Sequence, residues 1–119
     1  MDRTDELMAY IADFCKKRDW DQFHNPKDLA IGLSTEANEL LDIFRFKTDA
    51  QMKAMMEDPE KRKEISGELA DVFFFILRFA QMNNFDLFQC VADKMAYNEE
   101  RYAVEKVKGK NLKYTEYEE

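Results

Sequence analysis

The chain of 119 residues contains little glycine, proline or cysteine, and these shortages narrow its class. Three glycines and two prolines, beside abundant Leu, Ala, Glu, Lys and Met, predict a mostly helical chain. The two cysteines, Cys15 and Cys90, lack the spacing of a metal site, and each falls near an apolar helical face. We therefore expect both to be reduced core thiols.

Long apolar runs and an excess of basic residues are also missing. The longest apolar run, Val72 to Leu77, is far too short for a membrane span. The first residues are charged and contain no apolar signal region, so we expect a cytoplasmic protein. With a net charge of −7 and no basic patch, the chain is not expected to bind a nucleic-acid polymer.

What the chain does contain is helical periodicity over most of its length, within a single domain spanning residues 1–119. Asn25–Pro26 and Asp58–Pro59 each pair an N-cap residue with proline at the first helical position. The expected helices run from about Thr4 to Arg18, from Pro26 to about Phe46, from Pro59 to about Met82, and from a cap at Asp86 to near Lys108.

Short connections between amphipathic helices predict an all-α protein with a four-helix bundle. A helical turn is expected around Ala50 to Met56, and residues 109–119 should form an irregular tail beyond the helical core of 1–108. Ten Phe and seven Met are many for one small bundle, which favours an oligomer with an apolar interface. The alternative is an aromatic-rich core within one chain.

Two pairs of acids at helical spacing, Glu36/Glu39 and Glu68/Asp71, are the main candidates for a functional site. Residues three apart lie on nearly the same side of a helix, so two packed helices would bring four carboxylates together. At about 4–5 Å each like-charge pair costs roughly 3–4 kcal/mol at an effective dielectric of about 20. A divalent cation relieves that repulsion, and oxygen-only ligands favour Mg²⁺ or Mn²⁺ over zinc.

Acid pairs at this spacing are common by chance in a chain with 25 acids, and most decorate solvated helix faces. A helical wheel distinguishes acids on a solvated helix face from acids on the apolar face. Glu36 and Glu39 fall beside Ile43 on the apolar side, and Glu68 falls among Phe side chains, with Asp71 at the margin. Acids so placed are seldom buried unless they are paired or bind metal. Half-exposed acids without a ligand remain the alternative.

The last predicted helix carries a polar stripe between apolar residues. Polar groups placed in this way usually face a cleft, ligand or partner, and Lys and Arg suit phosphate oxygens. An internal ion-pair network on the bundle surface is the alternative. The stripe consists of Lys94, Asn98, Arg101 and Glu105.

Trp20, His24 and Phe46 lie in or next to loops near the predicted acid site. An aromatic ring beside a phosphate site can stack on a base, although a lone Trp or Phe is more often a core residue. His24 is the only histidine and does not occupy the acid-x-x-His position of a di-iron carboxylate bundle. Its position argues against a di-metal oxidoreductase.

Together these motifs resemble the MazG-like, all-α nucleoside triphosphate pyrophosphohydrolases, in particular the small dCTP pyrophosphatase branch. The paired acids are preceded by a Trp loop and followed by K-M-x-x-N-x-x-R-Y. The matching stretches are RDWDQFHNPKDLA, STEANELLDIFRFK, EISGELADVFFFIL, DKMAYNEERY and KYTE, which cover most of the chain.

The resemblance implies a homodimer or a dimer-of-dimers tetramer that hydrolyses a nucleoside triphosphate to a monophosphate and pyrophosphate. It implies that the four acids, Glu36, Glu39, Glu68 and Asp71, bind Mg²⁺, for which Mn²⁺ can substitute. It also implies that Trp20 and Phe46 lie around the base and that the substrate contacts Lys94, Asn98, Arg101 and Tyr102. His24, in the same loop as Trp20, is a further substrate-binding candidate.

Three positions depart from that pattern. Thr35 stands where the longer family motif often has an acid, Phe75 stands where the dCTP pyrophosphatase branch has Tyr, and Ile11 stands where it can have His. All three concern the choice of substrate more than hydrolysis.

The function expected from the sequence is Mg²⁺-dependent hydrolysis of a nucleoside triphosphate, with a pyrimidine deoxynucleotide such as dCTP or a modified dCTP as substrate. Glu39 is the candidate general base. The resemblance further implies housecleaning of the nucleotide pool. A non-enzymatic helical interaction module, which would bind a partner through its Met and Phe side chains, is the rival from another class.

Overall fold

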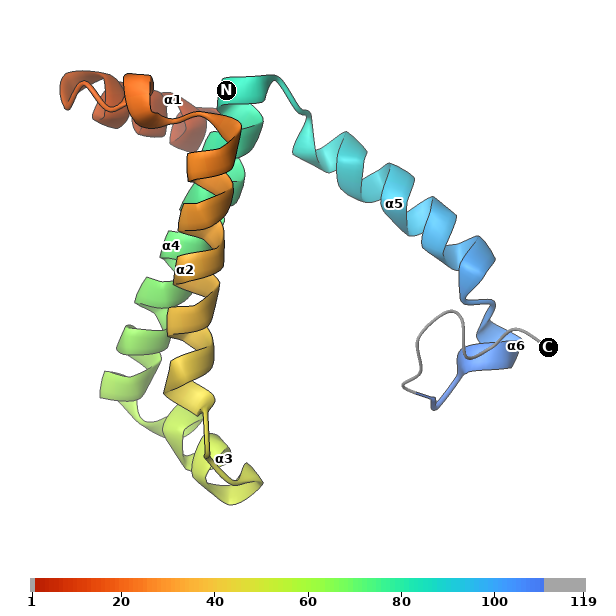
Figure 1. Ribbon diagram of the computed structural model, residues 1–119. Helices are drawn as coiled ribbons and strands as arrows, with labels where there is room; N and C mark the ends of the chain where they lie inside the picture. Colours follow the sequence, from red (N-terminus) through yellow and green to blue (C-terminus); the bar gives the residue numbers. More distant parts are fainter. Residues whose placement is uncertain (1, 111–119) are drawn as a thin grey trace. The chain divides into compact units, whose positions relative to one another are not determined.

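The computed structural model describes residues 2–110, which divide into two units between Asn84 and Phe85. The described residues contain six α-helices, one short 3-10 helix and no strand, which confirms the expected all-α class (Figure 1). The first unit contains α1 (Arg3–Lys17), the 3-10 helix η1 (Asp21–Phe23), α2 (Pro26–Phe44), α3 (Asp49–Glu57) and α4 (Pro59–Asn83). The second unit contains α5 (Leu87–Arg101) and α6 (Val104–Val107).

The predicted helix starts are confirmed at both cap-proline steps. The Asn25 side chain accepts a hydrogen bond from the Asp28 amide at 2.8 Å, and Asp58 accepts one from the Lys61 amide at 3.3 Å. Each cap satisfies an amide that the first helical turn leaves without an intrahelical partner.

The segment between α2 and α4 is more helical than expected, because α3 has nine residues rather than one turn. A capping box starts it: Thr48 accepts from the Gln51 amide, and the Gln51 side chain accepts from the Thr48 amide.

Two predicted helix ends are wrong. The helix expected to reach Phe46 ends at Phe44, because Arg45 is extended and Phe46 has a left-handed φ of 64°. The helix expected to reach Lys108 ends at Arg101, because Tyr102 and Ala103 leave the helical region before the short helix α6 begins. The β-branched Val104 and Val107 beyond that break favour helix less than unbranched residues do. The predicted exit at Gly109 has a left-handed φ of 80°, and residues 111–119 of the predicted tail lie outside the described residues.

Helices α2 and α4 run antiparallel and side by side, and α1 and α3 both pack on α4 (Figure 1). Cys15 is buried, as expected, whereas Cys90 is exposed on α5, so the expectation of a second core thiol is wrong. None of the described helices combines the length and the apolar character that a membrane-spanning segment needs. The buried apolar side chains are Ile11, Cys15, Leu29, Ile65, Leu77 and Ala80.

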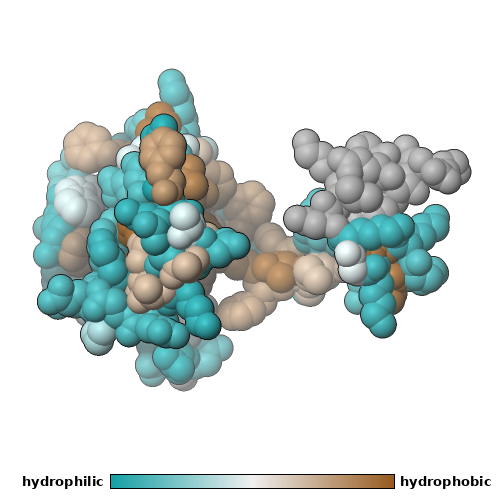
Figure 2. Space-filling model, turned by 90° about the horizontal axis from the view of Figure 1, so that it is seen from below, coloured by the Kyte–Doolittle hydropathy of each residue, from teal (hydrophilic) through white to brown (hydrophobic). Residues whose placement is uncertain are grey.

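Large apolar side chains also remain at the surface of the first unit, where brown atoms interrupt the teal ones in Figure 2. An apolar groove of about 310 Å³ lies between α1 and α4, lined by residues that include Leu7, Phe14, Phe73 and Leu77.

The close packing of α2 on α4 depends on Gly32. A Cβ atom at this position would lie 2.3 Å from the Phe75 ring, closer than real contacts allow. Gly32 lies one turn before Glu36 on α2, and Phe75 lies one turn after Asp71 on α4. The glycine therefore sets the distance between the two helices beside the acidic residues.

Gly32→Ala is expected to destabilise the protein by about 1–3 kcal/mol, because the added methyl group forces the Phe75 ring or the helices apart. Gly67→Ala is the matched control on α4, where a Cβ would have nothing within 4 Å. This control should stabilise the protein by about 0.5–1 kcal/mol through helix propensity. Urea denaturation measures both. Equal effects of the two substitutions would contradict the role assigned to Gly32.

Candidate functional site

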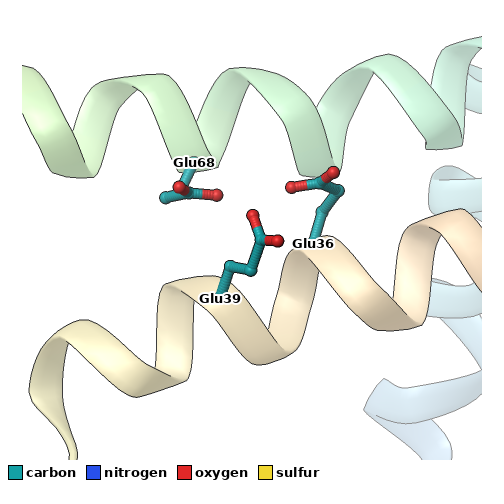
Figure 3. A group of neighbouring side chains, drawn as sticks. All are labelled: Glu36, Glu39 and Glu68. Atoms are coloured by element: carbon teal, nitrogen blue, oxygen red, sulfur yellow. The ribbon is translucent and has the colours of Figure 1, made fainter.

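Three of the four predicted acids meet between α2 and α4. Glu36 and Glu39 project from α2 toward Glu68 of α4, and each supplies a carboxylate oxygen to a group whose atoms all lie within 4.8 Å of one another (Figure 3). The antiparallel pairing explains the convergence, because the two α2 acids lie one turn apart on the face that packs on α4.

Two of these carboxylates have an oxygen that no protein group satisfies. Glu36 and Glu68 are half-buried, and Oε2 of each is buried without a hydrogen-bond partner. Leaving a buried charged oxygen without a partner is costly, so it is expected only where something else binds it. The orphaned oxygens fit a cation between the two helices.

The pKa values of Glu36 and Glu68 are both raised above that of an ordinary glutamate. A hydrogen bond with Glu39, then burial, then the negative charges of Glu39, Asp71 and Glu68 raise the pKa of Glu36 to about 7. Burial, followed by the charge of Glu39, raises the pKa of Glu68 as well. A bound cation would act in the opposite direction and favour the charged forms.

Asp71 is exposed and lies outside the group of three. It comes one turn after Glu68 on α4, and its charge contributes to the raised pKa values of Glu36 and Glu68. The fourth acid is therefore near the site, as its marginal position on the helical wheel suggested. Within residues 2–110, the three glutamates are the only such group of acidic, histidine or cysteine side chains. A set of carboxylate oxygens alone suits a hard ion such as Mg²⁺ or Mn²⁺.

Trp20 and His24 flank η1 in the loop between α1 and α2. The Trp20 ring is 40% exposed, so it is not a core residue, and it meets Phe14 edge to face at 5.6 Å between centroids. The His24 ring lies 6.3 Å from the Trp20 ring. The two side chains thus present neighbouring rings at the start of α2.

The α4 residue that holds this loop was not among the sequence-based candidates. Arg78 is 2% exposed and donates hydrogen bonds to His24, Asp21 and Gln81. The sequence did contain a signal for this role, because Arg78 interrupts an apolar stretch of the helix. A charged residue in such a place is buried only when it has a partner.

Phe46 lies at the other end of α2 from Trp20. Its ring is 88% exposed and the Arg45 guanidinium lies 4.7 Å from the ring centroid. A helix of 19 residues is about 28 Å long, so one chain does not bring Trp20 and Phe46 to the same base. A left-handed φ is rare for an aromatic residue and tends to occur at functional sites.

The polar stripe belongs to the second unit. Lys94, Asn98 and Arg101 lie on α5, and Tyr102 is its C-cap residue. The Tyr97 ring lies 4.9 Å from Lys94 Nζ and 5.1 Å from the Arg101 guanidinium carbon. Glu105 lies on α6 beyond the break, so its expected place on the same helical stripe is wrong.

The chain is all-α, and two of its antiparallel helices carry a cluster of three glutamates that could hold a metal ion. No family model matches the chain. It is 36% identical over 112 residues to dCTP pyrophosphatase 1 of Rattus norvegicus and of Mus musculus, and 35% identical to that of Homo sapiens. Each match covers 94% of this chain and 66% of the relative, so a third of each relative lies outside the match.

A crystal structure of a pyrophosphatase from Archaeoglobus fulgidus has the same fold. Its TM-score is 0.81 at 29% identity, and the match covers 87% of this chain and 94% of that one. Both comparisons confirm the resemblance found in the motifs. The chain is a relative of the all-α nucleoside triphosphate pyrophosphohydrolases, and among them of the dCTP pyrophosphatase 1 proteins.

Binding of a divalent ion should strengthen about tenfold between pH 6 and pH 8, because a proton competes for Glu36 near pH 7. The same raised pKa means that the ion-free protein loses stability as pH rises from about 4.5 through 7, and the ion should restore it. Calorimetric titration with Mg²⁺ measures the binding, and thermal unfolding measures the stability.

Glu36→Gln should weaken binding and remove most of this pH dependence. Asp42→Asn, which changes an exposed acid on the same helix, is the control and should bind like the unmodified protein. Equal binding by both variants would show that the ion does not bind to the α2–α4 cluster.

Proposed function

We propose that this chain is a divalent-metal-dependent nucleotide pyrophosphohydrolase. It hydrolyses a (d)NTP to the monophosphate and pyrophosphate. The observation that carries the proposal is the group of three glutamates with orphaned buried oxygens, in a chain similar to dCTP pyrophosphatase 1. The names of those relatives favour dCTP as the substrate. A modified dCTP, and a role in housecleaning of the nucleotide pool, belong to the same proposal and rest on the family resemblance of the motifs.

Glu36, Glu39 and Glu68, with Asp71 beside them, would hold Mg²⁺, or Mn²⁺ in its place. The bound ion supplies charge neutralisation for the triphosphate and a water more acidic than bulk water. Because Glu39 is exposed while its two partners are half-buried, it has the freest approach to an attacking water and is the candidate general base.

The remaining residues would bind the substrate. Lys94 and Arg101 suit the phosphate oxygens, and Asn98 on α5 and Tyr102 at its C-cap offer further polar contacts. Trp20, His24 and Phe46 offer rings to the base.

Self-association, as a homodimer or a dimer of dimers, belongs to the same proposal. Trp20 and Phe46 lie at opposite ends of α2, so their contact with one base requires rings from two copies. The apolar groove between α1 and α4 and the exposed Leu69 and Phe73 are surfaces that a second copy would cover.

The choice of base is expected to differ in detail from that of the dCTP pyrophosphatase branch. Phe75 has no hydroxyl to offer a base or sugar, and its ring packs in the space left by Gly32. This arrangement favours a nucleotide whose recognition does not need a tyrosine hydroxyl at that point.

Incubation with Mg²⁺ and a panel of canonical and modified NTPs and dNTPs is expected to give monophosphate and pyrophosphate from one or a few substrates. Chromatography separates these products from diphosphate and orthophosphate, which would indicate cleavage of the wrong bond. Glu36→Gln and Asp71→Asn should each lower kcat/KM more than about a hundredfold with the fold intact, and Asp42→Asn should not. No product from any nucleotide, together with no effect of Mg²⁺ on stability, would favour the helical interaction module.

A further inference from the structure

Arg78 is the only charged side chain that is buried among residues 2–110. Each of its three guanidinium nitrogens donates a hydrogen bond to a different residue, two of them at η1 and one on α4. Nε donates to Nδ1 of His24 at 2.8 Å, one terminal nitrogen donates to Gln81 at 2.6 Å, and the other donates to Asp21. Gln81 in turn donates to the carbonyl of Met8 on α1 at 2.8 Å. The network therefore ties α1, the η1 loop and α4 together.

A buried guanidinium is stable only while its partners stay in place, because removing one leaves an uncompensated charge. The two partners that lie outside α4 belong to the loop that carries Trp20. The rest of that loop is held by the backbone, where the Trp20 amide donates to the Cys15 carbonyl at 3.0 Å and Asp19 has a left-handed φ of 57°. The start of the loop is thus fixed by its backbone bond to α1, and Arg78 restrains the later part through the side chains of Asp21 and His24.

The hydrogen bond from Arg78 also determines the tautomer of the neutral His24 ring. A guanidinium nitrogen can only donate, so Nδ1 of His24 accepts and the neutral ring carries its hydrogen on Nε2. Burial and the Arg78 charge lower the pKa of His24, and the Asp21 charge partly opposes them. Cys15 on α1 is the titratable group that faces the Arg78–Asp21 pair from the third element. The Nε2–H group lies on the side of the ring away from Arg78, on a half-exposed residue.

We propose that Arg78 is a positioning residue that holds Trp20 and His24 as one unit for nucleotide recognition. Trp20 presents a ring on which a base can stack, and His24 presents a fixed Nε2–H donor to an acceptor atom of that nucleotide. This inference rests on the proposed function for its substrate. The restraint on the loop is independent of that function, because it follows from the hydrogen bonds of Arg78.

The single tryptophan of the chain makes the restraint measurable without any nucleotide. Trp20 fluorescence reports only on this loop, and a protonated imidazole beside an indole quenches it. Arg78→Met removes the charge and all three donors while keeping an apolar side chain of similar length. The control is Arg62→Met on the same helix, where the guanidinium donates a hydrogen bond to the Met56 carbonyl in the last turn of α3.

Arg78→Met should make Trp20 more accessible to acrylamide and should move the pH midpoint of its fluorescence upward, because His24 loses the nearby positive charge. Asp21→Asn should increase the accessibility but move the midpoint downward, because Asp21 favours the protonated ring. His24→Asn, which keeps an acceptor for Arg78, should abolish the midpoint. Arg62→Met should behave like the unmodified protein.

In nucleotide hydrolysis, Arg78→Met should raise KM about tenfold and change kcat less than about threefold, since the acids on α2 and α4 are untouched. Unchanged quenching, midpoint and KM in a folded Arg78→Met protein would overturn the proposal. If that variant does not fold, unchanged quenching and midpoint in Asp21→Asn would overturn it instead. If no nucleotide is hydrolysed while the fluorescence changes occur as expected, the proposed function fails and the restraint on the loop stands.

Discussion

Glu36, Glu39 and Glu68 place three carboxylates within 4.8 Å of one another on two helices that packing holds together. At such distances like charges repel by several kcal/mol unless protons or a cation intervene. With its pKa raised to about 7, Glu36 is about half protonated at neutral pH when no ion is bound. The close approach of α2 and α4 at Gly32 is what keeps the acids from separating, so the site depends on a contact one turn away.

The buried Arg78 and the acidic cluster differ in whether the protein itself provides partners for their charges. Arg78 is buried and has a protein partner for each of three nitrogens, so it contributes rigidity to the loop that carries Trp20. Glu36 and Glu68 each have a buried oxygen without any protein partner, so they are suited to an added ligand. Each group includes a residue of α4, which supplies Glu68 to the acidic cluster and Arg78 to the loop that carries Trp20.

Much of the fold could be predicted because its signals are local. Asn25–Pro26 and Asp58–Pro59 fixed two helix starts through cap chemistry, and the position of Glu36 and Glu68 on apolar faces predicted their convergence. The end of α2 before Phe46 and the break after Arg101 were missed, because neither has a glycine or proline to mark it. The Arg78 network joins residues more than 50 positions apart, and such pairing is not visible in helical periodicity.

The central claim is that the α2–α4 acids bind a divalent ion, and locating the ion tests it most directly. Crystals of the protein soaked with Mn²⁺ would reveal the ion by its anomalous scattering. The account predicts a strong peak between Glu36, Glu39 and Glu68, at about 2.0–2.3 Å from carboxylate oxygens. A saturated crystal with no peak at this position, or with peaks only elsewhere on the surface, would contradict it.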